Sequence, residues 1–458
     1  MTKFLEKNLL FIFPTIFLIF VRYGYQFNGL SGELSHVIFQ QTLLGLSEGG
    51  TFLGVYPLIG GAIGILFSNE TFWLQFISAL GFVIAVFATY QLYDVKSKKE
   101  NLKPYFFVTL TLSPVMLQHG VSILNNMLCL GFLMAAWLFS YRFWKAQKNQ
   151  DFLLSVVLLT LTLFTNLVVF PLLIVPLYWL LKTVFTKKTL YSYFIGSSFF
   201  FVLLLGHIGA VLSNFQNVEQ ITEWRISNFF SLNKNTTFGE QVSVIPNAFF
   251  GLYSIFHPIY FLLGIVLVFF IKPQKDLKKR WYLWVTIAIY LFFIAGFPYQ
   301  NPRLLLFIIP FVCMAFTAAF GRFYKLIKKQ LKLHMVFTII LVFTQLGLFT
   351  FHFSEEFKRG KLEQQLAIYI EGFPQKNIYA SGMQKVLMSY VNNKSSIDFT
   401  RKEFTNFQRN SLVVANENDI LNYDTSSFVF KNWSLMNNNY ELRKIKKFQY
   451  GWALFELR

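Results

Sequence analysis

The chain has 458 residues, of which 55% are hydrophobic and 19% aromatic, and its mean hydropathy is +0.47. This composition excludes a soluble fold for most of the chain. The formal net charge is +19, from 41 basic and 22 acidic residues. A basic balance can indicate nucleic-acid binding. Here 22 of the 41 basic residues lie in short connectors between hydrophobic runs, so we expect no nucleic-acid partner.

Hydrophobic runs recur along the chain at lengths of about 20 residues, enough to cross a hydrocarbon core of ~30 Å. Each would satisfy its backbone hydrogen bonds as a helix. We predict a mainly α fold, a polytopic membrane helical bundle with about eleven transmembrane helices. The predicted spans are 8–24, 71–93, 104–119, 121–143, 152–168, 169–184, 191–213, 246–271, 281–297, 302–320 and 334–352.

The distribution of Lys and Arg predicts the orientation of these helices. With the N-terminus in the cytoplasm, 22 basic residues fall in cytoplasmic segments. Only Arg22, Arg225, Lys234 and Arg303 lie outside before residue 353. This asymmetry follows the positive-inside rule. It predicts an extracytoplasmic tail over 353–458, and cytoplasmic segments at 1–7, 94–103, 142–151, 182–190, 272–280 and 321–333.

The first outer loop, residues 25–70, is predicted to hold two helices that lie in the membrane interface. Ser31 can cap the first helix, with Glu33 in its first turn, where the helix dipole favours negative charge. Apolar residues then recur at helical spacing. The second predicted helix, 56–67, is too short to cross the bilayer comfortably. A crossing there would also place the later basic clusters on the outer side.

The tail changes character at about residue 353, and its pattern predicts one small α/β domain. We therefore divide the chain into a membrane domain, 1–352, and an extracytoplasmic domain, 353–458. The predicted helices of the tail are 354–372 and 383–392. The predicted strands are 377–382, 411–415, 427–431, 440–445 and 452–457.

The polar clusters of the membrane domain lie at the outer ends of the predicted helices. They include Gln118-His119-Gly120, Asn125-Asn126, the loop 214–245 and the turn 297–303. Ion carriers usually place ionisable groups near mid-membrane, where this chain is apolar. A site at the outer interface suits a lipid-linked substrate, whose headgroup lies there while its tail stays in the bilayer.

Four stretches carry a resemblance to a known family. They are Gly32-Glu33-Leu34-Ser35-His36, Tyr56-Pro57-Leu58, Asn125-Asn126-Met127-Leu128, and Pro302-Arg303-Leu304-Leu305-Leu306 followed by Pro310. Together with the layout of the helices, they resemble the GT-C membrane glycosyltransferases, in particular the protein O-mannosyltransferase and lipid A aminoarabinose transferase group. The family usually has Asp-Glu where this chain has Gly32-Glu33, and Asp where it has Asn126.

The resemblance implies transfer of a sugar from a polyprenyl-phosphate-linked donor to a glycan, lipid or protein acceptor on the extracytoplasmic side. It also implies an integral multi-pass protein of the bacterial inner (plasma) membrane, with a divalent metal ion as a possible cofactor. Phosphate is a good leaving group, so one base that takes the acceptor's proton suffices. Glu33 is the candidate catalytic base, and Arg303 is the candidate holder of the phosphate.

Further candidate substrate-binding residues are His36, Asn126, Tyr299 and Arg225. Each candidate also has a structural interpretation. Glu33 can be an ordinary first-turn acid, and Arg303 a snorkelling interface anchor. His36 can assist Glu33, join a metal or serve the fold alone. Asn126 can be a polar side chain at a helix end, Arg225 one partner of an ion pair in a loop, and Tyr299 a member of an aromatic belt.

Two other functions remain open at this point. A protein that transports lipid-linked glycans without transferring them, such as a flippase, would need a polar passage through the bilayer, which the pattern does not show. A polymerase or ligase of surface polysaccharide more often has a large outer loop with several Arg and His. The loop 214–245 has one Arg, one Lys and no His.

Overall fold

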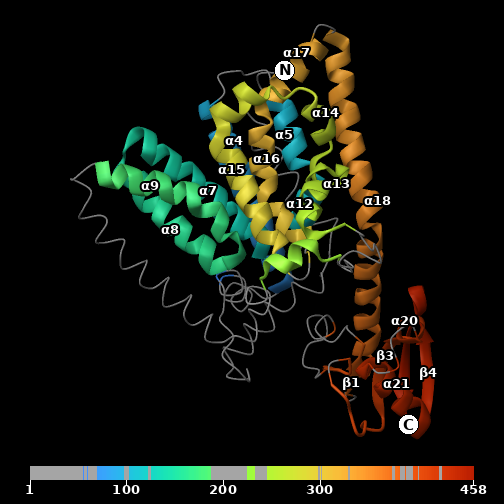
Figure 1. The fold of residues 1–458 in the computed structure, drawn as a ribbon. Coiled ribbons are helices and arrows are strands. Elements are labelled where there is room, and N and C mark those ends of the chain that lie inside the picture. The colour runs from blue at the N-terminus through green and yellow to red at the C-terminus, as the bar shows by residue number, and fades with distance from the viewer. Residues whose placement is uncertain are drawn as a thin grey trace. The chain divides into compact units, whose positions relative to one another are not determined.

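In the computed structural model, a bundle of helices and a small sheet domain are formed by separate parts of the chain (Figure 1). The chain divides near Phe353 into two compact units, and residues 354–458 belong to the second. The structure describes Val55, Ile59, Leu387 and residues 70–96, 103–121, 125–186, 224–232, 245–297, 300, 302–328, 331–373, 377–381, 396–400, 402–421, 425 and 427–458.

The first half of the described bundle is built on a close pair of helices, α4 (Glu70–Lys96) and α7 (Asn125–Ala146). They cross at two glycines. A Cβ at Gly131 would lie 2.7 Å from the carbonyl oxygen of Gly81, and a Cβ at Gly81 would lie 2.5 Å from that of Met127. Small residues allow such close backbone approach between membrane helices. Next to this pair lie α5 (Lys103–Thr111), α6 (Pro114–Val121), α8 (Asn149–Thr165), η2 (Leu167–Leu173) and α9 (Ile174–Thr186).

The second half of the described bundle centres on α15 (Pro273–Ala295). The turn η6 (Pro302–Ile308) returns the chain beside α15, because the buried Tyr290 hydroxyl donates a hydrogen bond to the carbonyl of Leu304 at 3.0 Å. The other elements are η5 (Ile226–Phe230), α12 (Asn247–Phe256), α13 (Pro258–Phe261), α14 (Gly264–Val268), α16 (Ile309–Ala315), α17 (Thr317–Lys328) and α18 (Leu331–Glu371).

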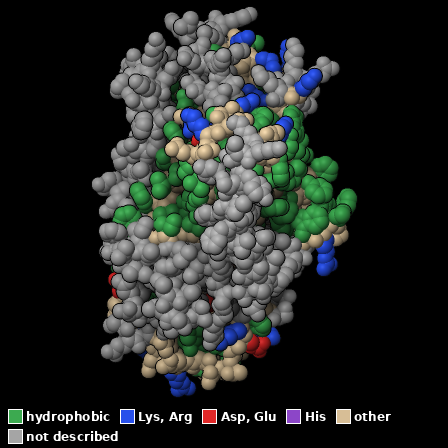
Figure 2. Space-filling view, turned by 90° about the vertical axis from the view of Figure 1, so that its left-hand side faces the viewer, with side chains coloured by type: hydrophobic (Ala, Val, Ile, Leu, Met, Phe, Trp, Pro, Cys, Tyr) green, Lys and Arg blue, Asp and Glu red, His purple; other side chains and the backbone are tan. Residues whose placement is uncertain are grey.

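The bundle's surface matches the expected lipid environment. Large hydrophobic side chains such as Phe87, Leu153 and Phe170 are exposed on it. Figure 2 shows hydrophobic side chains across the middle of the bundle, with Lys and Arg side chains gathered at one end. Among the described helices, four are long and apolar enough to cross a membrane: Gln75–Tyr93, Asn125–Ala146, Leu167–Thr186 and Val336–Ser354. The predicted polytopic helical fold is thus confirmed, and the number of eleven spans stays a prediction.

Several spans predicted as continuous helices are broken. The segment 104–119 forms α5 and α6, separated at Leu112 and Ser113. The Ser113 hydroxyl donates to the carbonyls of Ile259 and Tyr260 at 3.1 and 3.0 Å. The segment 246–271 forms α12, α13 and α14. The segment 302–320 forms η6, α16 and the start of α17, with a bend of 56° at Phe316. Buried polar partners satisfy backbone groups at such breaks.

The second unit is the predicted small α/β domain. Its five-stranded sheet has the order β2-β1-β3-β5-β4. The strands are β1 (Ile378–Ala380), β2 (Ser396–Asp398), β3 (Ser411–Asn416), β4 (Leu442–Lys447) and β5 (Trp452–Leu457). The first three are parallel, and β5 runs antiparallel to both β3 and β4. The C-terminal part of α18 covers one face, and α21 (Phe428–Asn439) covers the other, next to the short α20 (Glu417–Leu421).

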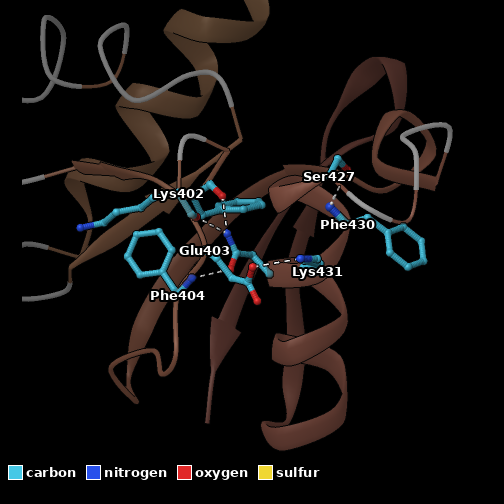
Figure 3. A network of polar contacts seen from close by, with 8 residues as sticks. Lys402, Glu403, Phe404, Ser427, Phe430 and Lys431 are labelled. Atoms are coloured by element: carbon cyan, nitrogen blue, oxygen red, sulfur yellow. Dashed lines mark hydrogen bonds and ion pairs between the residues drawn. The ribbon is translucent and has the colours of Figure 1, made fainter.

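The prediction of a strand at 427–431 was wrong. These residues begin α21, whose buried positions Val429, Trp433 and Met436 recur at helical spacing. The Ser427 hydroxyl caps the helix by accepting from the Phe430 amide at 3.3 Å. Buried Asn432 then ties the helix to the preceding loop, donating to the carbonyls of Phe399 and Lys402 and accepting from the Phe404 amide. Figure 3 shows Ser427 and Phe430 of the cap, and Lys402, Glu403 and Phe404 of this loop. The strand β2 was not predicted, and the predicted helix 383–392 lies outside the described residues apart from Leu387.

Candidate active site

Buried polar side chains lie at the bundle end where α6 finishes and where α7 and η6 begin. They include Gln118, His119, Asn126 and Gln300, each at most 7% exposed. The side chain of Asn125 joins this end of α7 to the end of α8 by donating to the carbonyl of Thr165 at 3.0 Å. The basic connectors 142–151 and 272–280 lie at the other ends of α7, α8 and α15. The polar end is therefore the one predicted to face outside.

The C-terminal end of α15 is closed by side chains from distant parts of the chain. The last carbonyls of a helix have no partners within the helix. Here the Trp224 indole donates to the carbonyl of Phe293 at 2.8 Å, and Asn228 donates to that of Gly296 at 2.8 Å. Asn247 and Gln300 donate to the carbonyl of Phe297 at 3.0 and 3.3 Å. These bonds hold the C-terminal end of α15, from which the chain continues towards η6.

Arg303 stands in the first turn of η6. Pro302 presets the backbone at the start of η6. The residues that follow, Leu304–Ile308, are buried, so η6 is anchored in the bundle. Arg303 itself is half-buried, and its Nε atom is out of contact with solvent. A guanidinium placed in this way presents a fixed fork of donors, the geometry that suits a phosphate group.

His119 lies close enough to Arg303 for the guanidinium charge to act on it. Its side chain is 1% exposed. Within the described part of the chain its Nδ1 atom has no hydrogen-bond partner. An unsatisfied buried polar atom costs about 1–3 kcal/mol, so a hydrogen bond to Nδ1 from a bound group would be favourable. Together a neutral imidazole and a guanidinium can donate hydrogen bonds to an oxyanion.

Two further candidates can be located. Asn126 is buried in the first turn of α7, and the neighbouring Asn125 makes the bond to Thr165. Arg225 is exposed before η5, and its backbone amide donates to the carbonyl of Gly296 at 3.0 Å. The backbone of Arg225 and the start of η6 therefore meet at the same corner of α15. Arg225 lies at the end of α15 that precedes η6, and its side chain is exposed.

The remaining candidates, Glu33, His36 and Tyr299, lie outside the described residues, as do the two predicted interfacial helices of the first outer loop apart from Ile59. Their proposed roles rest on the sequence. Among the residues that the structure does describe, no group of three or more His, Cys, Asp or Glu side chains is placed to hold a metal ion.

Comparison with solved structures finds a match of the fold over nearly the whole chain. The fold matches the crystal structure of ArnT from Cupriavidus metallidurans bound to undecaprenyl phosphate, with a TM-score of 0.63 and 10% sequence identity. The match covers 98% of this chain and 97% of that one. The chain has a GT-C-like fold. The apo structure of the same ArnT gives a TM-score of 0.58 at 10% identity, over 99% of this chain and 98% of that one.

The GT-C-like fold is thus shared at a sequence identity where individual residues have diverged. No protein-family profile matches the sequence, and no curated protein matches it either. The importance of His119 does not show in the sequence, where it stands only within the polar cluster Gln118-His119-Gly120. Its burial and its closeness to Arg303 appear only in the folded chain.

Proposed function

We propose that this protein is an integral membrane glycosyltransferase, which moves a sugar from a polyprenyl-phosphate-linked donor to an acceptor on the extracytoplasmic side. The observation that carries the proposal is the half-buried Arg303 beside the buried His119, at the polar end of a GT-C-like bundle. The likeness to an ArnT that binds undecaprenyl phosphate supports a lipid phosphate as the ligand of this pair.

The proposed reaction needs few protein groups. An acceptor hydroxyl attacks the anomeric carbon of the donor sugar, and the bond from that carbon to the phosphate oxygen breaks. The polyprenyl phosphate leaves with the bonding electrons, and Arg303 stabilises its negative charge. Glu33 takes the proton of the attacking hydroxyl. In this scheme a divalent ion, where bound, adds charge stabilisation at the phosphate.

The remaining candidates would act on binding. Asn126, at the start of α7, and Arg225, at the corner of α15, are placed on elements that border Arg303 or its turn. We assign His36 and Tyr299 to substrate binding from their places in the sequence, next to Glu33 and before Arg303. The acceptor is a glycan, a lipid or a protein that reaches this end of the bundle.

The proposal is tested first by binding of the lipid phosphate. Purified full-length protein in nanodiscs is titrated with undecaprenyl phosphate. We expect Arg303→Ala to weaken binding about tenfold or more, because charge-assisted hydrogen bonds contribute about 1.5–3 kcal/mol. His119→Leu should weaken it less. Lys148→Ala, which removes one exposed positive charge at the opposite end of α8, is the control. Equal affinity of Arg303→Ala and Lys148→Ala would remove Arg303 as the phosphate holder.

A further inference from the structure

The C-terminal domain contains a cleft that the proposed transfer chemistry does not use. It has a volume of about 1020 Å³ and lies between the last turns of α18 and the end of β4. Gln365, Tyr369 and Phe373 line one side, and Lys446, Lys447 and Phe448 line the other. No Asp or Glu is among its described lining residues.

Aromatic rings form the floor of the cleft. The centroids of Tyr369 and Phe373 lie 5.8 Å apart, and those of Tyr369 and Phe448 lie 5.9 Å apart. All three side chains pack against the hydrophobic cluster beneath α18, which includes Leu366 and Ile370. This hydrophobic cluster therefore holds the three rings in place, and part of their surface faces the open cleft.

Lysine side chains stand over this floor. The Lys446 ammonium lies 4.2 Å from the centroid of the Tyr369 ring and 5.3 Å from that of Phe448. These cation–π contacts restrict the side chain. A β-bulge between Lys444 and Lys446 shifts the register of β4 against β5, and bulges of this kind re-aim side chains. The bulge in the edge strand β4 thus places the Lys446 ammonium next to the aromatic rings of the cleft.

The charges of β4 fall into two groups. Arg443 and Lys444 form ion pairs with Glu456 and Glu417, at 4.0 and 2.6 Å. Lys446 and Lys447 are exposed and have no carboxylate partner among the ion pairs of the described residues. Basic residues on an edge strand also prevent edge-to-edge pairing. That role does not require two lysines without acidic partners at an aromatic cleft.

We infer that this cleft binds an anionic sugar unit of a glycan. The C–H faces of a sugar ring pack on aromatic rings, and its carboxylate or phosphate pairs with Lys446 and Lys447. The amide of Gln365 can bond its hydroxyls. A concave site with an apolar floor and a few polar groups suits a small ligand unit better than a flat bilayer surface. This inference rests on the proposed function, in which the glycan would be the acceptor of the transferred sugar.

The test uses full-length protein in nanodiscs of zwitterionic lipid, with a galacturonic acid hexamer as the anionic probe and maltohexaose as its neutral counterpart. We expect the hexamer to bind, and the binding to weaken as salt rises. Lys446→Gln with Lys447→Gln should weaken it about tenfold or more. Lys402→Gln is the matched control, because Lys402 is exposed and lies 5.2 Å from the Phe404 ring, outside the cleft.

Equal binding of the two hexamers, or wild-type affinity in the double variant, would overturn the inference. A second outcome would overturn the inference in favour of a contact with the bilayer. In that outcome the galacturonic acid hexamer does not bind, and the protein instead binds nanodiscs of anionic lipid in a way that depends on Lys446 and Lys447. The proposed function is judged separately. Glu33→Gln should leave hexamer binding unchanged while transfer falls, and hexamer binding without any transfer by the wild type would count against the proposed function alone.

Discussion

At the residue scale, a few charged groups in an apolar bundle carry the functional argument. Arg303 follows the C-terminal end of α15, where backbone carbonyls accept hydrogen bonds from Trp224, Asn228, Asn247 and Gln300. Fixed donors stabilise developing charge without reorganisation when the reaction occurs. The structure of this corner is therefore the reason that Arg303, rather than another basic residue, is proposed to hold the phosphate.

The proposed base gives a prediction at this scale. Glu33→Gln keeps the size and hydrogen-bonding capacity of the side chain but removes the proton acceptor. General-base catalysis contributes about 10²- to 10⁴-fold, so we expect sugar transfer to fall by that factor while lipid-phosphate binding is retained. The measurement compares initial transfer rates of membranes with matched protein levels. A wild-type rate in Glu33→Gln would remove Glu33 as the base.

Sequence patterns located some of these residues and missed others for physical reasons. Arg303 was found because it follows two prolines at an outer helix end, a local feature. His119 was not among the predicted site residues, because its burial and the effect of the Arg303 charge on it depend on how α6 and η6 pack in the fold. The closing of α15 by Trp224 and Asn228 could not be predicted either, since about 70 residues separate each donor from its acceptor.

At the element scale, the crossing of α4 and α7 depends on two glycines whose backbones touch. We predict that Gly131→Ala destabilises the bundle by about 1–3 kcal/mol, the usual cost of overpacking. Its new methyl would meet the backbone of Gly81, which cannot move like a flexible side chain.

The matched control for that prediction is Gly347→Ala in α18. A Cβ at Gly347 would meet no described atom within 4 Å, and alanine favours a helix over glycine. Thermal unfolding in detergent should show a lower midpoint for Gly131→Ala and an unchanged or higher one for Gly347→Ala. Equal midpoints would mean that the glycine crossing does not hold the two helices together.

Sequence periodicity at this scale predicted where apolar helices lie better than where they break. The predicted span 71–93 falls inside α4, because nothing in it interrupts a helix. The break at Leu112 and Ser113 comes directly before Pro114, which begins α6 and disfavours a helical conformation in the residue that precedes it. The bonds that Ser113 makes there could not be predicted, because their acceptors, Ile259 and Tyr260, lie about 146 residues away. In the tail, Trp452–Leu457 was predicted as a strand and is β5. The run 427–431 looked like a strand only because its helical periodicity extends beyond it, to Met436.

At the scale of the whole molecule, orientation decides which end of the bundle can meet an extracytoplasmic acceptor. The basic connectors predict that residues 353–458 lie outside the cytoplasm. Alkaline phosphatase fused after Arg458 should therefore be active in intact bacteria, and the same enzyme inserted within 272–280 should be inactive. The opposite pair of results would place the Arg303 end in the cytoplasm, and the proposed acceptor side would be wrong.

The central claim is that the protein transfers a sugar from a lipid phosphate rather than only moving or holding the lipid. The most direct measurement uses purified protein in sealed vesicles with polyprenyl-phosphate donors, each carrying a labelled hexose or pentose, and a panel of glycan, lipid and peptide acceptors. We predict that label leaves the polyprenyl carrier and appears on an acceptor, with free polyprenyl phosphate released, and that Arg303→Ala slows this step. Label that crosses the bilayer while it remains attached to its carrier, with every donor and acceptor, would contradict the account.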